Sequence, residues 1–480
     1  MESHKRRPDL MIEVIRPDYN AKTFSPGNPV AQFSSASYAI QDEKFSNALV
    51  SYNFKESLET VDGDFSMTLT IEKDNSQRTW LDKLRIRDLV LISEFGRVQY
   101  AGYIDNIRLS AKMTGDGKPD RKILVNGGNF GKMLSSFKLV LDQFLFAGVD
   151  GQAEIDSTQL MSKLAQIREK DTGIALALIA IYKDYMKLAL EMGNVNPSGR
   201  GVKPILEYYI DYSSELSKDL KIKYAFAPTL YQVGENSIWD IWGALVHPPL
   251  NELFGRWSPL LNVYQLVFRE TPFEPDKWKF LEKNVIPPIV VRSYDIGKSD
   301  QEVFTFYASV LPGQYLDWKA AAGIDSSSVI TDKEKWSKYG YRPLIVKNRY
   351  FNRDKLESFS DQSVPSIMKA ISTKMKRWFG KNDEFASGTL EMMTISPDEW
   401  RDSRYNGLQN PRVGEKIGLL DGEFYVESSE HSWSYLSPMI TKLSISRGYK
   451  YNPDGSLDKP IYGTEEEVAT YETGGFEIER

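Results

Sequence analysis

Few side chains in this sequence could carry out catalysis. The 480 residues include no cysteine and only three histidines, His4, His247 and His431. A chain without cysteine has no disulfide framework, no zinc–thiolate site and no cysteine nucleophile. Three scattered histidines give almost no material for a His-ligated metal site or a serine–histidine triad. We therefore predict no catalytic residues, no metal site and no cofactor.

A glycine-rich segment, residues 127–133, superficially resembles a phosphate-binding loop. That loop needs a glycine at the position of Asn126 and a serine or threonine, which holds magnesium, at the position of Met133. Neither requirement is met. We predict instead a glycine-rich exit from a strand into a helix.

Two of the histidines fit structural positions better than catalytic ones. His247 precedes two prolines at a predicted helix end, near Asp240 and Glu252 in sequence. A lone histidine there is more often a cap or a packed side chain than a base. His431 lies on an alternating strand beside Trp433, where stacking or a solvent-facing position is the default.

Carboxylates are abundant, and they leave one enzymatic alternative open. A glycosidase needs two carboxylates held about 5–10 Å apart in a cleft. Neighbouring acids such as Asp398 with Glu399, or Glu427 with Glu430, could form such a pair. No pair is singled out by its sequence context.

Aromatic and basic clusters have simpler interpretations. Trp239 and Trp242 are three residues apart on one predicted helix, which favours an apolar core face over a ligand platform. The basic run at residues 374–378 could contact a phosphate or an acidic partner. Such a run is usually the solvated side of a helix.

Composition indicates a β-rich protein that does not depend on nucleic-acid binding. The net charge of −6 gives no strong electrostatic attraction to phosphates. The 26 Tyr, 23 Phe and 10 Trp residues suit β packing and protein interfaces. The most apolar stretch, residues 174–182, is about half the ~20 residues of a membrane span, so we predict no membrane insertion. Basic residues 5–7 precede Pro8 without an apolar core, and we expect synthesis in the cytoplasm without a signal peptide.

The elements that must position these side chains are dominated by a β signature that occurs twice. The first copy covers residues 63–127, with a turn at Gly96, and the second covers residues 384–448, with a turn at Asp421–Gly422. Short alternating runs occur in the same order and at similar spacing in both copies. Runs of this length and spacing predict antiparallel barrels or sandwiches. The second copy is too short for a barrel, so we expect it to take strands from residues 221–310.

The fold class that follows is α+β, with two similar antiparallel β-barrel tube domains and helical and mixed α/β insertions. The periodicity changes to three- and four-residue steps after residue 131, which predicts helices at 137–146, 157–170 and 174–192. The predicted domains are an N-terminal arm (1–30), a first β-barrel tube domain (31–135), a helical insert (136–220), a discontinuous second tube domain (221–310 plus 383–450), a mixed α/β insertion (311–382) and an acidic C-terminal tail (451–480). The tail is expected to be loosely ordered or to contribute a docking strand.

An ordered series of short blocks resembles the baseplate hub proteins of phage tails and related contractile injection particles. In the centre of the chain, a helix with Ser-x-Trp-Asp leads through a proline break to Asn-Glu-Leu-Phe and a strand that ends in Phe-Arg-x-Thr-Pro-Phe. The first β unit adds a match to the tube-domain pattern of that family. The blocks are Ser237–Trp242, Pro248–Phe254, Leu266–Phe273, Trp80, Asp88–Val90 and Gly102–Asp105.

The resemblance implies a structural role without catalytic residues. A homotrimeric ring with two similar barrels per chain would form a pseudo-sixfold collar. That collar would join a hexameric tail tube protein to a trimeric central spike protein and contact other baseplate proteins, with transient passage of DNA or tape-measure protein. The particle would be a virion or an extracellular tail-like device such as a tailocin. Many members fuse the spike to the hub, whereas only a short acidic tail follows Tyr451 here, so the spike is expected to be a separate chain.

Two other functions remain open at the level of sequence. One is a tail-associated cell-wall hydrolase that uses a carboxylate pair. The other is a carbohydrate-binding β module in host recognition, with Trp and Tyr side chains as stacking platforms.

Overall fold

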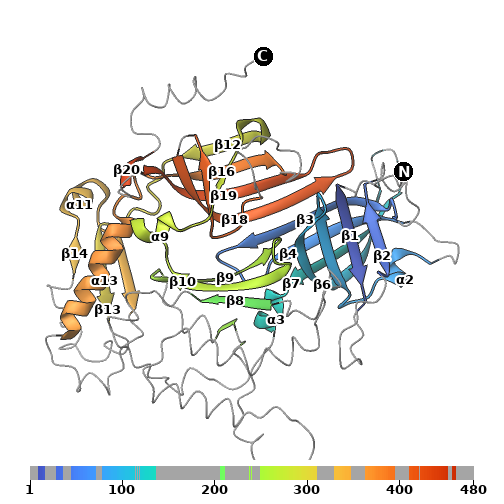
Figure 1. The fold of residues 1–480 in the computed structure, drawn as a ribbon, viewed down its shortest axis with the longest axis horizontal. Helices are drawn as coiled ribbons and strands as arrows, with labels where there is room; N and C mark the ends of the chain where they lie inside the picture. Colours follow the sequence, from blue (N-terminus) through green and yellow to red (C-terminus); the bar gives the residue numbers. More distant parts are fainter. Residues whose placement is uncertain are drawn as a thin grey trace, which may run out of the picture.

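The computed structural model contains one large, mostly antiparallel sheet, two smaller sheets and a few helices (Figure 1). The structure describes residues 9–16, 29–35, 45–71, 78–113, 115, 117, 119–136, 206–210, 237, 239–240, 249–310, 329–347, 363–394, 410–420, 422–451 and 457–460. The helices predicted at 137–146, 157–170 and 174–192 lie outside these residues, as do His4 and His247.

The large sheet consists of a first group of strands before residue 130 and a second group after residue 282. The first group is β1 (Leu10–Ile15), β2 (Ala31–Ser34), β3 (Leu49–Ser57), β4 (Asp64–Thr70), β5 (Leu89–Glu94), β6 (Arg97–Met113) and β7 (Pro119–Asn129). The second group is β11 (Lys283–Val285), β12 (Val291–Gly297), β16 (Ala386–Met393), β17 (Lys416–Leu419), β18 (Gly422–Ser434), β19 (Ile440–Tyr451) and β20 (Leu457–Pro460). We call β1–β7 unit 1, and β11, β12 and β16–β19 unit 2.

The two units share a single curled sheet. Its strand order is β12-β16-β19-β18-β3-β4-β7-β6-β5-β1-β2, with β17 pairing with both β18 and β11, and β20 pairing with β19. The units meet where β18 pairs antiparallel with β3, and Figure 1 shows these two strands side by side. The sequence predicted two similar barrels but not that they are joined edge to edge.

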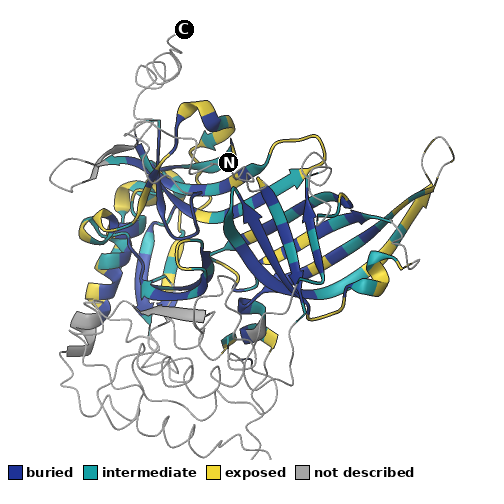
Figure 2. Cartoon of the chain, turned by 45° about the vertical axis from the view of Figure 1, so that its right-hand side comes forward, coloured by how far each residue is buried: buried dark blue, intermediate teal, exposed yellow. Residues whose placement is uncertain are grey.

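Alternating apolar residues explain why these strands form and where the core lies. In β1 the side chains of Leu10, Ile12 and Val14 are buried, and they pack in one cluster with Phe65 and Val125. A separate cluster in unit 2 joins residues of β16, β17, β18 and β19. Figure 2 shows these buried residues as dark blue stretches along the strands. Because successive side chains of a strand point to opposite faces, each curled unit encloses its own apolar core.

The two units have the same strand order. Within unit 1 the order is β3-β4-β7-β6-β5-β1, and within unit 2 it is β12-β16-β19-β18-β17-β11. Five strands of each unit therefore have counterparts of the same direction: β3 with β12, β4 with β16, β5 with β17, β6 with β18 and β7 with β19. The sixth position differs, because β1 is antiparallel to β5 whereas β11 is parallel to β17. The doubled signature read from the sequence is thus a repeat of topology.

Irregularities of the strands also coincide. Asp105 in β6 and Glu427 in β18 are the residues left out of register against β7 and β19, respectively. Val50 in β3 and Arg292 in β12 are left out against β4 and β16 in the same way. A β-bulge bends its strand and strengthens the twist, so both units curl at matching points.

A matching turn precedes β5 and β17. Arg87 and Gly414 both have positive φ, at 71° and 78°. The amide of Arg87 donates to the carbonyl of Ile104 at 2.8 Å, and the amide of Gly414 donates to the carbonyl of Val426 at 2.9 Å. These matched backbone bonds identify Arg87 with Gly414 and Ile104 with Val426 as counterpart residues.

The remaining elements lie beside the large sheet. One three-stranded sheet has the order β8-β10-β9 and the other β14-β13-β15. Their strands are β8 (Leu206–Ile210), β9 (Asn251–Ser258), β10 (Val263–Glu270), β13 (Phe306–Val310), β14 (Ile330–Thr331) and β15 (Pro343–Lys347). The helices are α2 (Trp80–Lys83), α3 (Gly131–Ser136), α9 (Pro275–Lys279), η4 (Pro288–Val290), α11 (Lys333–Tyr339) and α13 (Ser363–Phe379).

These elements confirm several predictions from the sequence. The α+β fold class is confirmed. The basic run at residues 374–378 lies on helix α13, as expected. Part of the C-terminal segment forms a docking strand, because β20 pairs with β19. Within the described residues, no helix is both long and apolar enough to cross a membrane.

Candidate functional site: the seam between the two units

The seam is the contact of β18 with β3, and the bulge at Glu427 makes it possible. Before the bulge, β18 pairs with β17 of its own unit. After it, Ser428–Ser434 pair antiparallel with Ser51–Ser57 of β3. One long strand therefore belongs to both units.

Aromatic side chains face one another across the seam. His431 lies opposite Phe54, with ring centroids 4.5 Å apart and nearly parallel. Trp433 lies opposite Tyr52, with centroids 6.3 Å apart. Cross-strand aromatic pairs contribute about 0.2–1 kcal/mol each beyond an alanine pair. His431 is buried, so its predicted stacking role is confirmed and the solvent-facing alternative is wrong.

A buried glutamate ties three strands together at this point. Glu94 of β5 accepts a hydrogen bond from the Tyr52 hydroxyl of β3 at 2.6 Å. Its other oxygen lies 2.9 Å from Nδ1 of His431 in β18. Burial raises the pKa of Tyr52 well above its ordinary value, and the nearby Glu94 carboxylate raises it further. The Tyr52 hydroxyl therefore keeps its proton and remains a donor.

A second buried acid, Glu56, comes from β3. Glu56 of β3 accepts a hydrogen bond from the backbone amide of Trp257 in β9 at 2.9 Å. Burial raises the pKa of Glu56 from 4.5 to about 7, and the Trp257 amide opposes this change only in part. The Trp257 indole also donates to the carbonyl of Val98 at 2.8 Å, so β9 contacts both β3 and β6.

A cluster of arginine and glutamate side chains, centred on Glu415, joins β9 and β11 to the segment that precedes β17. Nε of Arg412 lies 2.6 Å from Glu415, and the amide of Asn284 in β11 donates to Glu415 at 2.9 Å. Arg256 of β9 reaches the same carboxylate at 3.4 Å and donates to the carbonyl of Val413 at 2.9 Å. Desolvation by burial lowers the pKa of Arg256 to about 10, although Glu415 counteracts the shift. Buried charges are tolerated when they are paired in this way.

Unit 1 contains a counterpart of this cluster. Asp88 precedes β5 as Glu415 precedes β17, and each accepts a hydrogen bond from the backbone amide three residues earlier, at Arg85 and Arg412. Arg16, which follows β1, donates two hydrogen bonds to the Asp88 carboxylate, at 3.0 and 2.9 Å. A buried acid at the start of this strand is thus a feature of both units.

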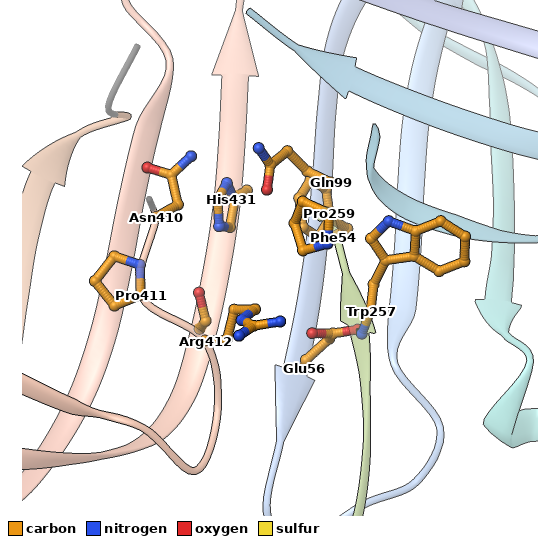
Figure 3. Close-up of a pocket in the computed structure, with 10 residues that line it drawn as sticks. Phe54, Glu56, Gln99, Trp257, Pro259, Asn410, Pro411, Arg412 and His431 are labelled. Carbon is orange, nitrogen blue, oxygen red and sulfur yellow. The ribbon is translucent and has the colours of Figure 1, made fainter. Parts of the chain in front are cut away.

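The seam leaves too little room for a substrate. The cavity drawn in Figure 3 is lined by Glu56, Trp257, Arg412 and His431, among others, and has a volume of about 10 Å³. That is roughly the space one water molecule requires. Because these side chains pair with one another and fill the space between them, the geometry holds strands together and does not present reactive groups to a ligand.

The glycine-rich segment behaves as the sequence predicts. Strand β7 ends at Asn129 and α3 begins at Gly131. A Cβ at Gly131 would lie 2.1 Å from the carbonyl oxygen of Val61, so glycine permits close packing there. Nζ of Lys132 lies 2.7 Å from the Asp105 carboxylate. Lys132 and Asp105 line an open cleft of about 410 Å³.

The other sequence candidates are dispersed. Trp378 is buried in a cluster with Leu250 and Tyr307. Lys374 forms an ion pair with Glu270, so the basic run is only partly solvated. Trp242, Asp398 and Glu399 lie outside the described residues. No group of three His, Cys, Asp or Glu side chains in the described part of the chain could hold a metal ion.

Sequence reasoning missed the buried acids Glu56, Glu94 and Glu415. A signal was present for one of them. Arginine stands three residues before an acid in both copies, at Arg85-x-x-Asp88 and at Arg412-x-x-Glu415. The isolated glutamates Glu56 and Glu94 carry no such pattern, because their partners come from strands distant in the sequence.

Comparison with solved structures finds similarity to tail proteins and to a PdpA–VgrG complex. No family model and no curated relative matches the sequence. The 43 kDa tail protein of prophage MuSo2 from Shewanella oneidensis matches with a TM-score of 0.47 and 13% identity, over 93% of this chain and 99% of that one. A tail protein from Neisseria meningitidis MC58 matches with a TM-score of 0.44 and 10% identity, over 92% and 96%. A Francisella PdpA–VgrG complex matches with a TM-score of 0.41 and 10% identity, over 92% of this chain and 58% of that one. The chain is similar to a prophage tail protein, to a second tail protein and to a PdpA–VgrG complex.

Proposed function

We propose that this chain is a structural baseplate hub of a phage tail or phage-tail-like injection particle. Three copies form a pseudo-sixfold ring that joins a hexameric tail tube on one face to a separate trimeric spike on the other. The role is structural, and the chain does not catalyse a reaction. The solved structures to which the chain is similar include two described as tail proteins, and the proposal assigns a role of the same kind.

The observation that supports this proposal is the internal repeat. An adaptor between sixfold and threefold partners needs two near-equivalent surfaces on each of three chains. Units 1 and 2 share strand order, bulge positions and the turn before β5 and β17. The domain boundaries that accompany the proposal are those predicted from the sequence, with the second tube domain interrupted at 311–382, except that β1 of the predicted arm joins the first tube domain.

The seam supports the proposal in a second way. It holds the two units in a fixed relation through one sheet and through buried pairs such as Glu94 with His431. A rigid relation between the units is what a ring of constant geometry requires. Flexible tethering would leave the sixfold face undefined.

Stoichiometry tests the proposal directly. Native mass spectrometry of the purified chain is expected to give a species of three times 54.8 kDa. Negative-stain images of that species are expected to show a ring with six similar lobes. A chain that stays monomeric at tens of micromolar, or that forms a ring without sixfold character, would overturn the proposal.

A further inference from the structure

Because the two units repeat one another, the strand pairing at the seam can be compared with the equivalent strands at the other ends of the units. The seam pairs the later half of the long strand of unit 2, Ser428–Ser434 of β18, with the first strand of unit 1, β3. The bulges identify the counterparts of these segments. Residues 106–112 of β6 correspond to the β18 segment, and β12 corresponds to β3.

The β6 segment has an unused edge. On one side, residues from Asn106 to Met113 pair with β7. On the other side, pairing with β5 ends at Tyr103, and the last backbone bonds involve Ile104. Among the described residues, no strand continues along that edge. Leu109 on this segment is 55% exposed.

Strand β12 has the complementary unused edge. It is the first strand of the large sheet and pairs with β16, and no other described strand pairs with it. Figure 1 shows it at the outer edge of unit 2. An open edge of this kind is a ready template for another strand.

Comparison with β3 shows what β12 lacks. Tyr52 and Phe54 of β3 are 2% and 3% exposed; they belong to the core cluster of unit 1, and Trp433 and His431 of β18 also stack on them. Their counterparts in β12 are Tyr294 and Ile296. Tyr294 is 36% exposed, so the side chain that the seam buries in unit 1 is uncovered in unit 2.

We propose that residues 106–112 of one chain pair antiparallel with β12 of a second copy of this chain, in the register of the seam. That register places Leu109 opposite Ile296, Ser110 opposite Asp295 and Ala111 opposite Tyr294. The occupant of the edge is thus a second copy. The proposal rests on the proposed function only for the closure of three such contacts into a ring.

The side chains of the two segments suit this register. Leu109 and Ala111 face Ile296 and Tyr294, on the side where the seam places its aromatic pairs. On the opposite side of the seam, Asn53 donates a hydrogen bond to Glu430.

The counterparts of that polar pair are oppositely charged. Asp295 corresponds to Asn53 and Arg108 to Glu430, so the new contact replaces an amide–carboxylate hydrogen bond with an acid–base pair. Diagonal neighbours on antiparallel strands are within reach of long side chains such as arginine.

The contact is head to tail, which matters for assembly. Unit 2 offers its long strand to unit 1 within a chain, and unit 1 offers its long strand to unit 2 of the next chain. Heterologous contacts of this type produce a ring when the rotation closes. Three chains then contain six similar seams, three internal and three between chains.

Cysteine cross-linking tests the register, and the absence of native cysteine makes the background clean. Chains carrying Leu109→Cys alone and Ile296→Cys alone are mixed and treated with a short bis-maleimide. A band of twice the chain mass that needs both chains is expected, since neither variant can form that heterologous link within itself. Leu109→Cys mixed with Leu436→Cys, whose side chain is 88% exposed, is the matched control and is expected to link at least fivefold less.

A charge exchange provides a second measurement that does not depend on cross-linking. Asp295→Arg is expected to weaken self-association at least tenfold by sedimentation, because it would place a second positive charge diagonal to Arg108. Adding Arg108→Asp to the same chain is expected to restore most of the association. Both residues are on exposed strand positions, so circular dichroism should report an unchanged fold.

The outcomes separate this proposal from the proposed function. A trimer by mass that gives no 109–296 link, or whose association ignores the charge exchange, overturns the edge pairing and leaves the hub intact. A chain that stays monomeric overturns both. A 109–296 link in an assembly other than a trimer supports the edge pairing and overturns the hub.

Discussion

At the scale of single residues, the seam depends on acids buried between strands. Glu94 is held by Tyr52 and His431, and Glu56 by the Trp257 amide. Leaving one member of such a pair without its partner exposes the other to the full cost of burial. These residues therefore specify how the two units join more than they add to net stability.

The raised pKa of Glu56 predicts a pH dependence of stability. The folded protein holds this proton up to about pH 7, whereas the unfolded chain releases it near 4.5. Because the folded state binds more protons in that window, the free energy of unfolding falls as pH rises from about 4.5 to about 7, by about 3 kcal/mol at most. Glu56→Gln is expected to remove this part of the fall in urea unfolding measured across the window.

A control and a contrary outcome accompany that experiment. Glu59→Gln, at an exposed position in the same segment, should leave the profile of the parent unchanged. Burial also raises the pKa of Glu415 and of Glu427, so a residual slope of the same sign is expected in every variant. Equal slopes for Glu56→Gln and the parent would show that Glu56 is not the group responsible.

At the scale of elements, glycines let strands approach one another closely. Gly127 of β7 lies between β4 and β6, and a Cβ there would be 1.9 Å from the carbonyl oxygen of Tyr103 and 2.4 Å from the Phe65 ring. The backbone must move to admit it. The sequence identifies the glycine-rich segment, but only the pairing of three strands explains why Gly127 has no side chain.

Gly127→Ala is therefore expected to destabilise the fold. Overpacking of a buried site costs about 1–3 kcal/mol. Thermal unfolding of the variant should begin at a lower temperature, while Gly115→Ala, where a Cβ would meet no atom within 4 Å, should unfold like the parent. An unchanged melting temperature for Gly127→Ala would contradict the close approach of β6 and β7.

The strands themselves could largely be predicted from sequence. Alternation and turn signals place β4, β5, β6 and β7 and their counterparts, because these cues are local. The partners of each strand could not be read in the same way. Strand β18 pairs with β3 more than 370 positions earlier in the chain, and no local pattern marks that pairing.

At the scale of the whole molecule, the seam is expected to make the two cores unfold together. The cores of unit 1 and unit 2 are separate clusters. They are coupled by the β3–β18 pairing with its aromatic contacts and by β9, which bonds to Glu56 and Val98 on one side and to Val413 and Glu415 on the other. A cooperative unfolding transition is expected for as long as this coupling exceeds the difference in stability between the units.

Removing the seam aromatics should separate the two units. The double variant His431→Ala with Trp433→Ala deletes the rings that contact Phe54 and Tyr52. Differential scanning calorimetry is expected to resolve two transitions in the variant and one in the parent. Tyr435→Ala, which truncates an exposed side chain next to the seam, is the control and should keep one transition. A single transition in the double variant would show that other contacts couple the units.

The sequence by itself determined that this chain is α+β and contains a β unit twice, since strand periodicity and turn residues are local properties. It also determined that cysteine and histidine chemistry has little material here, because composition alone decides that. Only the tertiary structure decided that the two units form one sheet, that Glu56, Glu94 and His431 meet at the seam, and that β6 and β12 keep matching open edges. Those facts depend on contacts between residues hundreds of positions apart, which arise when strands pair and which no short segment encodes.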